Sequence, residues 1–408
     1  MKRRVVITGI GIKSPIGNSL SEFQENLFAK KSGIQTMNCW DPIIGLKTKV
    51  AGIVVGIDEK EIPRKNRRSM DRGSILAALA SKDAIFDAKL SQKEISSYRT
   101  GISYGSTVGG GATLEKVFGD LREDKSYMKQ TSMDFLKYMS NTVCANLCSY
   151  LNIKGISIPI CSACTSSSQA IGMSYELIQN SQMDRMICGG AEGMHHSLAS
   201  IFDVMGAASS AYNQTPEQSS RPFDKNRDGV VVAEGAGTLI LEDRDTALKR
   251  GAKIYAEIIS YSTNCNGSHM TNPNEDSIIH VMERAINNAN LKATEIDYVN
   301  AHATSTYLGD IVESNAIYKL FKDKVPVSSL KGQIGHTLGA CGAIESIAAI
   351  CSIIQNKLPS NINIDNLDEE CSSLDYIKEV RKQEVTIVLK NNFAFGGINT
   401  SLIFKKYT

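Results

Sequence analysis

Short apolar runs alternate along the chain with longer segments whose apolar residues recur at helical spacing. The runs are rich in β-branched residues and predict buried strands. They cover residues 5–11, 100–106, 156–163, 185–192 and 238–243 in the first half, and 254–262, 297–303, 325–330, 385–392 and 400–405 in the second. Helices are expected between them, for example over 72–88 and 276–290. This alternation favours an α/β fold built from layers of sheet and helix.

Composition narrows the class of protein further. The chain has 408 residues, and its 42% hydrophobic and 22% charged residues are ordinary for a soluble globular protein. A net charge of +2 provides no general field that would attract nucleic acid or a membrane. The chain contains no run of 18 apolar residues, so no membrane span is expected. The apolar run after MKRR is too short for the core of a signal peptide. We therefore expect a cytoplasmic protein whose ten cysteines are reduced.

Two of these cysteines, Cys161 and Cys164, are spaced C-x-x-C within ISIPICSACTSSSQAIG. That spacing can indicate a redox dithiol or half of a zinc site, or it can have no significance. A fourth option is that one of the two cysteines is a nucleophile. A zinc site needs a second ligand pair, and neither a second C-x-x-C nor an H-x-x-x-H occurs. The adjacent His195 and His196 are a possible ligand pair but fit ordinary loop or helix-end residues better. A thioredoxin-like motif belongs to a much smaller domain, so we expect no metal and no redox dithiol.

The local pattern favours Cys164 as a nucleophile. The run ISIPI predicts a strand, and the apolar spacing after Cys164 predicts a helix. A thiol at the start of a helix is expected to have a lowered pKa, because the amides and the helix dipole stabilise the thiolate. Cys161 lies back toward the strand and is expected to be a small buried hydrophobic residue.

Two histidines stand in similar settings late in the chain. His302 comes just past the predicted strand in IDYVNA, and His336 follows the strand VPVSSL and a glycine-containing loop. Either could be an ordinary hydrogen-bonded histidine. The chain has only six histidines, however, and strand ends carry catalytic groups in α/β folds because the loops there converge.

The segment KNNFAFGGINTSLIF (390–404) predicts a strand followed by a turn at Phe395, Gly396 and Gly397. Two glycines let the backbone approach a ligand closely or adopt positive φ. Backbone N–H groups there could form an oxyanion hole. The alternative is a hairpin turn with packed aromatic side chains.

Four ordered motifs resemble those of the β-ketoacyl-acyl carrier protein synthases, most closely the elongating type. They read SACTSS (162–167), NAHATST (300–306), LKGQIGHTLGA (330–340) and NNFAFGGIN (391–399), and the stretch at 221–243 is typical of the same family. The resemblance runs from VVITGIG to the end of the chain. It implies a thiolase fold, in which residues 1–250 and 251–408 form two halves packed as α-β-α-β-α layers with the site between them.

The resemblance implies a decarboxylative Claisen condensation. Cys164 would take the acyl chain from an acyl carrier protein, with the amides of Cys164 and Phe395 as the oxyanion hole. His302 and His336 would donate hydrogen bonds to the thioester oxygen of malonyl-carrier protein as carbon dioxide leaves. Lys331 matches the active-site lysine of the family. No metal or other cofactor is implied, because phosphopantetheine arrives on the carrier protein.

Other positions match the family pattern residue by residue. Lys331 needs a charge partner, for which Asp310 and Glu313 are the candidates. Phe395 resembles a gating phenylalanine. The expected pantetheine contacts are Thr271, Thr304 and Thr306, and the expected acyl-pocket residue is Val108.

The basic segment RKNRRSMDR (64–72) matches the family's docking patch for the acidic carrier protein. Arg64, Lys65, Arg67 and Arg68 crowd the start of this segment, and Lys129 is a possible second contact. Charges of this kind would steer the encounter, which would then be sensitive to salt. The alternative is a solvated helix face, the commoner outcome for a charge run.

The motifs leave the pathway open between fatty acid and type II polyketide synthesis. Ala303 stands where the family usually has glycine, and CTSS and MDR resemble polyketide ketosynthases. The resemblance thus allows a homodimer or a heterodimer with a homologous chain-length factor. A degradative thiolase is a weaker alternative, because it uses a second cysteine near the C-terminus and the last one here is Cys371. Retention of Cys164 and its partners argues against a non-catalytic subunit.

Overall fold

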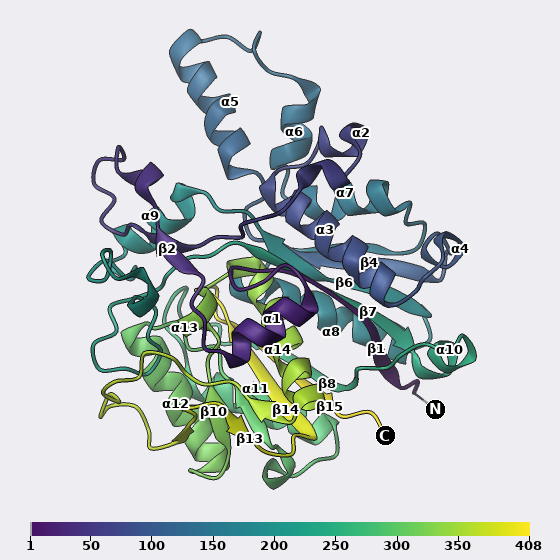
Figure 1. The fold of residues 1–408 in the computed structure, drawn as a ribbon, viewed down its shortest axis with the longest axis vertical. Coiled ribbons are helices and arrows are strands. Elements are labelled where there is room, and N and C mark those ends of the chain that lie inside the picture. The colour runs from purple at the N-terminus through teal and green to yellow at the C-terminus, as the bar shows by residue number, and fades with distance from the viewer. Residues whose placement is uncertain (1) are drawn as a thin grey trace.

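The computed structural model describes residues 2–408, and its core is one twisted sheet that runs through the whole molecule (Figure 1). The strand order is β12-β10-β9-β14-β15-β8-β1-β7-β6-β4-β5. The first half contributes β1 (Val5–Lys13), β4 (Thr100–Gly105), β5 (Ser157–Ile160), β6 (Arg185–Glu192) and β7 (Gly235–Asp243). The second contributes β8 (Ala256–Cys265), β9 (Tyr298–Asn300), β10 (Pro326–Ser328), β12 (Asp375–Tyr376), β14 (Ile387–Phe393) and β15 (Ile398–Lys405).

The sheet contains the same five-stranded unit twice. From the centre outward the first half runs β1, β7, β6, β4, β5, and the second runs β8, β15, β14, β9, β10. In both units the first two pairings are antiparallel and the next two are parallel. β1 and β8 pair antiparallel and join the units. The duplicated α/β architecture of a thiolase fold is therefore present, while the division at residue 250 stays a prediction.

Helices form three layers around the two halves of the sheet. α8 (Ser166–Gln179) follows β5, α14 (Cys341–Gln355) follows the β10 region, and the two pack together in the middle layer. α3 (Arg72–Asp87) and α7 (Thr142–Leu151) cover the outer face of the first half. α11 (Glu275–Asn288) and α12 (Tyr307–Phe321) cover the second. The order of layers is α-β-α-β-α, as the sequence led us to expect.

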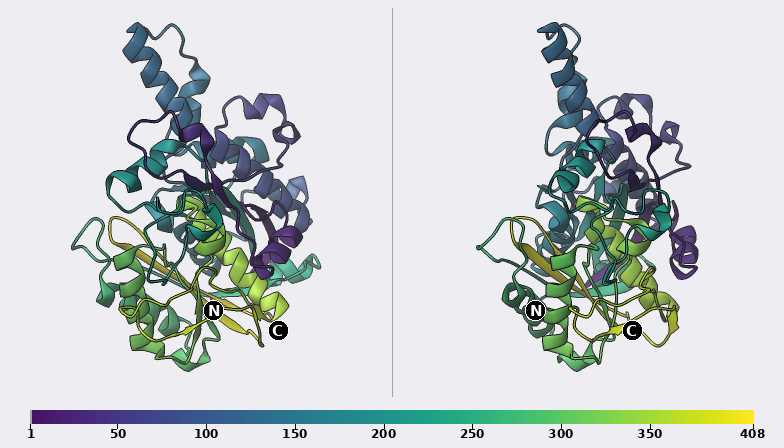
Figure 2. Two further views of the ribbon diagram at one scale, coloured as in Figure 1. Left: turned by 60° about the vertical axis from the view of Figure 1, so that its left-hand side comes forward. Right: turned by 90° about the vertical axis from the view of Figure 1, so that its left-hand side faces the viewer.

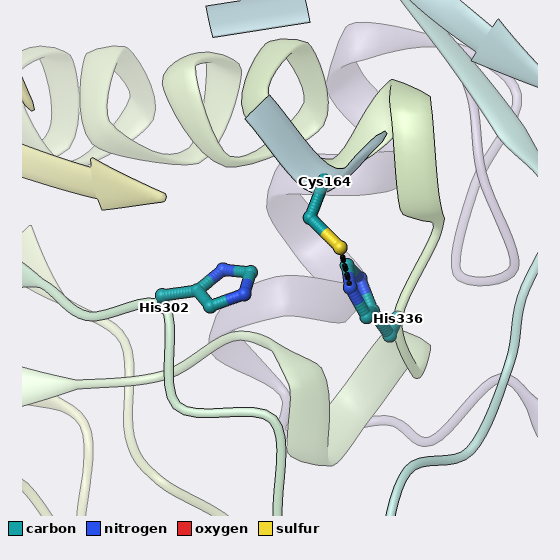
Figure 3. Close-up of side chains that lie close together, drawn as sticks. All are labelled: Cys164, His302 and His336. Atoms are coloured by element: carbon teal, nitrogen blue, oxygen red, sulfur yellow. Dashed lines mark hydrogen bonds between the residues drawn. The ribbon is translucent and has the colours of Figure 1, made fainter. Parts of the chain in front are cut away.

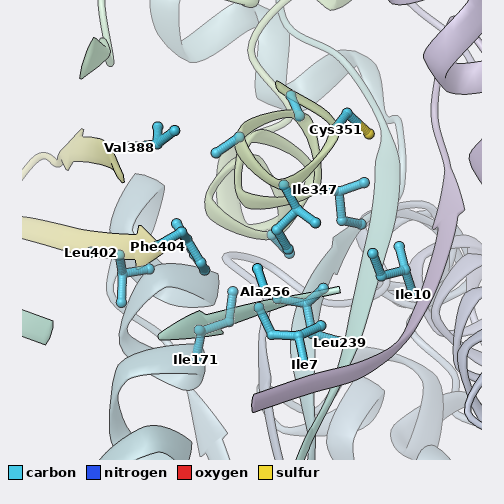
Figure 4. Close-up of a cluster of buried hydrophobic side chains, with 14 of the residues drawn as sticks. Ile7, Ile10, Ile171, Leu239, Ala256, Ile347, Cys351, Val388, Leu402 and Phe404 are labelled. Atoms are coloured by element: carbon cyan, nitrogen blue, oxygen red, sulfur yellow. The ribbon is translucent and has the colours of Figure 1, made fainter. Parts of the chain in front are cut away.

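The middle layer is the most apolar part of the molecule. Ile171 from α8 and Ile347 from α14 are fully buried among strand residues of both halves (Figure 4). The segment Leu338–Gln355 is long and apolar enough to cross a membrane, with a mean hydropathy of 1.6, but 89% of it is buried inside the protein. It is therefore a core helix. Burying a side chain of this size contributes about 1.5–3 kcal/mol to folding.

The remaining elements decorate this core. They are α1 (Leu20–Phe28), β2 (Ile34–Thr36), β3 (Val50–Gly52), α2 (Arg64–Arg67), α4 (Gln92–Ile95), α5 (Gly111–Asp124), α6 (Ser132–Tyr138), α9 (His196–Val204), α10 (Arg244–Lys249), α13 (Lys331–Ile334), β11 (Lys357–Leu358) and β13 (Arg381–Lys382). The α5–α6 hairpin projects from the body of the molecule in all three views (Figures 1 and 2).

Candidate active site

Cys164 lies in a sharp turn between β5 and α8. The preceding residue, Ala163, has a φ of +46°, a left-handed conformation that a residue with a side chain rarely adopts. A single 3₁₀ turn over Ala163–Thr165 then leads into the first turn of α8. The turn directs the thiol into a cavity while leaving Cys164 only 8% exposed. The predicted strand-to-helix junction is present. Cys161, predicted to be buried, is exposed instead.

The cavity has a volume of about 220 Å³ and draws its walls from both halves of the fold. Cys164, His302 and His336 line its floor together, and Figure 3 shows the thiol and the His336 ring facing one another with His302 beside them. The two imidazole rings meet edge to face with centroids 5.3 Å apart. Segments separated by more than 130 residues in sequence thus converge on one sulfur atom.

The hydrogen bonds around His336 define its tautomer. Its Nδ1 accepts a hydrogen bond from the Leu338 amide at 3.3 Å, so the proton of the neutral ring lies on Nε2. Nε2 is 3.0 Å from Sγ of Cys164. Burial, aided by the charge of Lys331, holds the pKa of His336 well below its usual value. The ring is therefore a neutral donor pointing at the sulfur.

His302 is held in the same way by different partners. Its Nδ1 faces two donors, Nζ of Lys331 at 3.2 Å and Nδ2 of Asn392 at 3.1 Å. Nδ1 must therefore accept, which leaves the proton on Nε2. Burial and the neighbouring Lys331 ammonium lower the pKa of His302 well below its usual value. Both histidines are thus neutral hydrogen-bond donors, and neither is a ready general base.

The charge partner of Lys331 is Glu345, and the prediction of Asp310 or Glu313 is wrong. Lys331 forms a buried salt bridge to Glu345 on α14 and also donates to the carbonyl of His302 at 2.6 Å. Although burial alone would lower it, the carboxylate of Glu345 raises the pKa of Lys331. Asp310 instead lies 3.6 Å from Arg227.

Glu313 positions the loop that carries His302. Its two carboxylate oxygens accept hydrogen bonds from the amides of His302 at 2.9 Å and Ala303 at 2.7 Å. Burial nevertheless raises the pKa of Glu313 to about 7. Its role is structural support of a catalytic loop. Charge neutralisation of Lys331 is left to Glu345.

The stretch at 221–243 braces both histidine loops. The backbone of His336 pairs with this stretch, donating to the Val231 carbonyl at 2.7 Å and accepting from the Ala233 amide at 2.9 Å. On the other side, the Arg227 guanidinium donates to the carbonyl of Thr306 at 3.1 Å. The connection explains why a segment with no catalytic side chain forms part of the motif set.

Three buried polar residues near the site escaped the sequence reading: Glu345, Lys390 and Asn392. Nδ2 of Asn392 donates to Glu345 at 2.7 Å, and Lys390 lies 3.5 Å from the same carboxylate. Burial lowers the pKa of Lys390 to about 8. The sequence does contain a feature that points to these residues. Glu345 is the one charged residue in the apolar helix α14, and Lys390 interrupts an apolar strand. A buried charge requires a partner.

The thiol of Cys164 is not a ready thiolate in this structure. Burial raises its pKa to about 12, although the charge of Lys331 and the backbone amide of Cys164 act in the opposite direction. The expected lowering by the helix start is therefore outweighed.

Phe395 forms part of the wall of the cavity. Its ring is 37% exposed and packs on Phe202 of α9 with centroids 5.7 Å apart. The following Gly396 and Gly397 have φ of +86° and +76°, as a tight hairpin turn between β14 and β15 requires. The two interpretations of this segment, a hairpin turn with packed aromatic side chains and a turn beside the reactive cysteine, are thus compatible. The hairpin turn also places Phe395 in the wall of the cavity that Cys164 lines.

The other predicted residues divide into two groups. Thr271, Thr304 and Thr306 line the same cavity as Cys164, with the last two joined by a hydroxyl contact of 3.0 Å. Val108 does not line this cavity, and its side chain is 40% exposed. The prediction that Val108 lines an acyl pocket is therefore not supported by the cavity of this single chain.

The basic segment forms the short helix α2. Arg64, Lys65 and Arg68 are exposed, whereas Arg67 is half-buried and donates to the Glu59 carbonyl at 2.8 Å. Lys129, at the tip of the α5–α6 hairpin, forms an exposed salt bridge with Asp124 at 2.5 Å. Arg67 is thus engaged within the protein, whereas Arg64, Lys65 and Arg68 are exposed.

Comparisons with known proteins agree along the whole chain. Residues 2–247 match the Beta-ketoacyl synthase N-terminal domain, and residues 255–365 match the C-terminal domain. The chain is 37% identical over 407 residues to 3-oxoacyl-[acyl-carrier-protein] synthase 1 of Haemophilus influenzae, covering 99% of each chain. It is 38% identical to the Escherichia coli K12 synthase 1 over 408 residues, again covering 99% of each.

Solved structures give the same picture. A beta-ketoacyl synthase from Burkholderia phymatum superposes with a TM-score of 0.96 and 41% identity over the full length of both chains. The ishigamide ketosynthase/chain length factor superposes with a TM-score of 0.93 and 29% identity, again over the full length of both chains.

Proposed function

This chain belongs to the β-ketoacyl synthase family, and we propose that Cys164, His302 and His336 carry out its chemistry. Its reaction is the condensation of an acyl chain with a malonyl unit, both delivered as thioesters of acyl carrier protein, which makes it an acyltransferase of the condensing type. The single observation that carries the residue assignment is the convergence of one thiol and two neutral imidazole Nε2–H groups in one buried cavity.

In the first half-reaction the sulfur of Cys164 attacks the carbonyl carbon of the acyl thioester. The C–S bond to the carrier's phosphopantetheine breaks, and the thiol proton passes to the departing sulfur, so that the acyl group ends on Cys164. The tetrahedral intermediate carries an oxyanion, for which the amides of Cys164 and Phe395 are the donors. Among residues 2–408 no backbone acceptor engages the Phe395 amide, which leaves it available.

In the second half-reaction malonyl-carrier protein enters beside the acylated cysteine. The bond between the malonyl carboxylate and its α-carbon breaks, carbon dioxide leaves, and the electron pair forms an enolate. The Nε2–H groups of His302 and His336 donate to the enolate oxygen. The α-carbon then attacks the acyl carbonyl and expels the Cys164 sulfur as a thiolate, giving a β-ketoacyl-carrier protein. A proton from water restores the thiol of Cys164. Because decarboxylation generates the carbanion, no strong base is required, which suits two neutral imidazoles.

The carrier protein brings the phosphopantetheine arm, and we assign no resident cofactor to the reaction. Thr271, Thr304 and Thr306 stand at the cavity wall where that arm would pass, and their hydroxyls suit its amides. The exposed cations Arg64, Lys65 and Arg68 would meet the acidic surface of the carrier. Lys129 is a weaker candidate because Asp124 already engages it.

We propose that the enzyme works as a dimer built on the exposed edge of β5. This strand ends the sheet, and its residues alternate between exposed and half-buried. An unprotected edge is a surface for pairing with another chain. Identities of 37–41% to β-ketoacyl synthases, against 29% to a ketosynthase/chain length factor, favour two copies of this chain over a heterodimer. Sedimentation of the purified chain tests this directly.

These identities also favour fatty acid elongation over polyketide synthesis, which remains the second candidate. A cytoplasmic location is consistent with ten free cysteines. The thiolase alternative is disfavoured because, within residues 2–408, Cys164 is the only cysteine among the residues that line the cavity.

Intact-mass spectrometry tests the assignment. Incubation with acyl-carrier protein should add one acyl group to the wild type and to Cys39→Ala, an exposed cysteine elsewhere, but none to Cys164→Ala. Adding malonyl-carrier protein should then convert the adduct to β-ketoacyl-carrier protein. If the product forms only with an added homologue, the heterodimer is correct. An adduct that survives in Cys164→Ala would refute the nucleophile.

A further inference from the structure

Three side chains outside the active site converge where the α5–α6 hairpin joins the body of the molecule. They are Glu115 from the first turns of α5 and the adjacent His195 and His196 at the start of α9. The carboxylate reaches both rings, with Oε2 3.1 Å from Nε2 of His195 and Oε1 3.1 Å from Nε2 of His196. Nothing in the condensation reaction uses this cluster.

Adjacent residues in an extended segment point to opposite sides, so the pairing of these two rings needs a cause. His195 is the N-cap of α9, with extended φ and ψ of −148° and 144°, whereas His196 is already helical. The change of backbone conformation between them brings the ring centroids to 4.1 Å. Gly111 leaves room for this, because a Cβ there would lie only 3.2 Å from the His195 ring.

We propose that Glu115, His195 and His196 form a binding site for a divalent transition metal of the zinc class. Two imidazole nitrogens and one carboxylate are a common ligand set for such an ion. Ligands about 2.0–2.1 Å from a tetrahedral ion lie about 3.3 Å from one another. The Oε2–Nε2 distances to His195 and His196, 3.1 and 3.4 Å, are close to that spacing, and all the ligand atoms lie within 4.8 Å of one another.

The surroundings also suit a metal ligand at His195. Its Nδ1 is 2.8 Å from the hydroxyl of Ser197 and accepts a longer hydrogen bond of 3.4 Å from the Ser197 amide. When Nε2 binds the ion, the proton moves to Nδ1, which then donates to the hydroxyl in place of the amide contact. The side chain of Glu115 is 60% exposed, so the fourth position faces solvent and a water molecule can complete the tetrahedron.

A metal at this position would tie the base of the hairpin to α9. The same helix carries Phe202, whose ring packs on Phe395 in the wall of the catalytic cavity. An ion at the start of α9 would therefore hold one end of the helix whose other end contacts the cavity wall.

Cobalt titration followed by visible absorption tests the proposal, because Co²⁺ reports both geometry and ligand type. The wild type should show the intense bands of a tetrahedral ion without the near-ultraviolet thiolate band that cysteine ligation would give. Glu115→Gln and His196→Gln should each weaken Co²⁺ binding by at least about 10–100-fold. His280→Gln, an exposed histidine on α11, is the matched control and should bind as the wild type does.

Thermal unfolding provides a readout that is independent of catalysis. Zn²⁺ should raise the Tm of the wild type and of His280→Gln but not that of Glu115→Gln or His196→Gln. Circular dichroism verifies that each variant is folded. Equal Co²⁺ affinity in all four proteins, or a thiolate band in the wild type, would overturn the proposal. The thiolate band would indicate a cysteine such as Cys164, which lies near His302 and His336, as the metal ligand.

Discussion

The carboxylate of Glu345 lies between two buried ammonium groups, so its replacement tests how the interior of the site is held together. It forms a salt bridge with Lys331 and lies 3.5 Å from Lys390. The side chains of Glu345 and Lys390 have no exposure and that of Lys331 has 1%. Glu345→Gln keeps the shape of the side chain and removes the only negative charge that directly pairs with the two cations.

The expected cost follows from the burial of the pair. Removing one partner of a buried ion pair destabilises a protein by about 3–5 kcal/mol, because the remaining charge is left without compensation. The loss should depend on pH with a definite sign. Glu345 raises the pKa of both lysines, and that of Lys390 is already lowered to about 8 by burial. Without the carboxylate, burial should bring the folded-state pKa of each lysine below its unfolded value of about 10.4, so the unfolded chain binds more protons. The stability of the variant should therefore rise between about pH 7 and 10, as the buried ammonium groups lose their protons.

Equilibrium unfolding in urea at pH 6.5 and pH 9, followed by circular dichroism, measures the effect. Glu283→Gln, an exposed acid on α11, is the matched control and should change the free energy of unfolding by less than about 0.5 kcal/mol. The reasoning fails if Glu345→Gln behaves like that control. It also fails if the loss is equally large at both pH values.

Three further changes have definite expected outcomes. Burial raises the pKa of Glu192 to about 7, so its protonated carboxyl contributes stability that is fully present below the unfolded pKa of about 4.5 and is lost as the pH rises through 7. In Glu192→Gln, the free energy of unfolding in urea should lose this pH dependence, which amounts to about 3 kcal/mol over the same range. Arg64→Ala combined with Arg68→Ala should lower kcat/KM for acyl-carrier protein by about tenfold at low salt and leave turnover of a small pantetheine thioester unchanged; equal losses for both substrates would contradict docking. Gly397→Ala should destabilise the protein by about 1–3 kcal/mol in urea and slow condensation, since φ is +76° and the new Cβ would lie 2.2 Å from Asn266; wild-type stability and rate would refute the strain.

The strands and layers could be predicted because each is encoded locally. The run at 100–106 became β4 and the periodic segment at 72–88 became α3, each within one residue at either end. The short central strands were harder, since β9 covers only Tyr298–Asn300 of the run predicted at 297–303. Tertiary contacts end that strand early, because the carboxylate of Glu313 holds the amide of His302 in place of a ladder partner.

The charge network could not be assigned from local sequence because its members meet only in three dimensions. Asp310 and Glu313 follow His302 in sequence and were natural candidates, yet α12 directs them to Arg227 and to the loop amides. Glu345 reaches Lys331 because α14 starts just after the His336 loop and turns that face back toward the site. A single carboxylate in an apolar helix is the sequence feature that predicts such a partner.

The duplication of the fold explains why the reactive groups meet where they do. α8 and α14 occupy equivalent places in the two repeats, and their first turns touch, since Sγ of Cys341 donates to the Cys164 carbonyl at 3.1 Å and the Ala343 amide donates to Ser167 Oγ at 3.0 Å. Two helix N-termini therefore face the same small volume, and each favours negative charge.

Burial opposes that effect by raising the pKa of the resting thiol of Cys164 to about 12. In the proposed mechanism, the negative charge would develop on the oxygen atoms of the bound thioester, where the backbone amides and the neutral His302 and His336 rings would donate to it. Donors that are fixed in advance would then make a charged resting nucleophile unnecessary. Burial keeps the thiol protonated at rest, whereas the Cys164 amide, which favours negative charge on the sulfur, is one of the donors that would stabilise the oxyanion once substrate is bound.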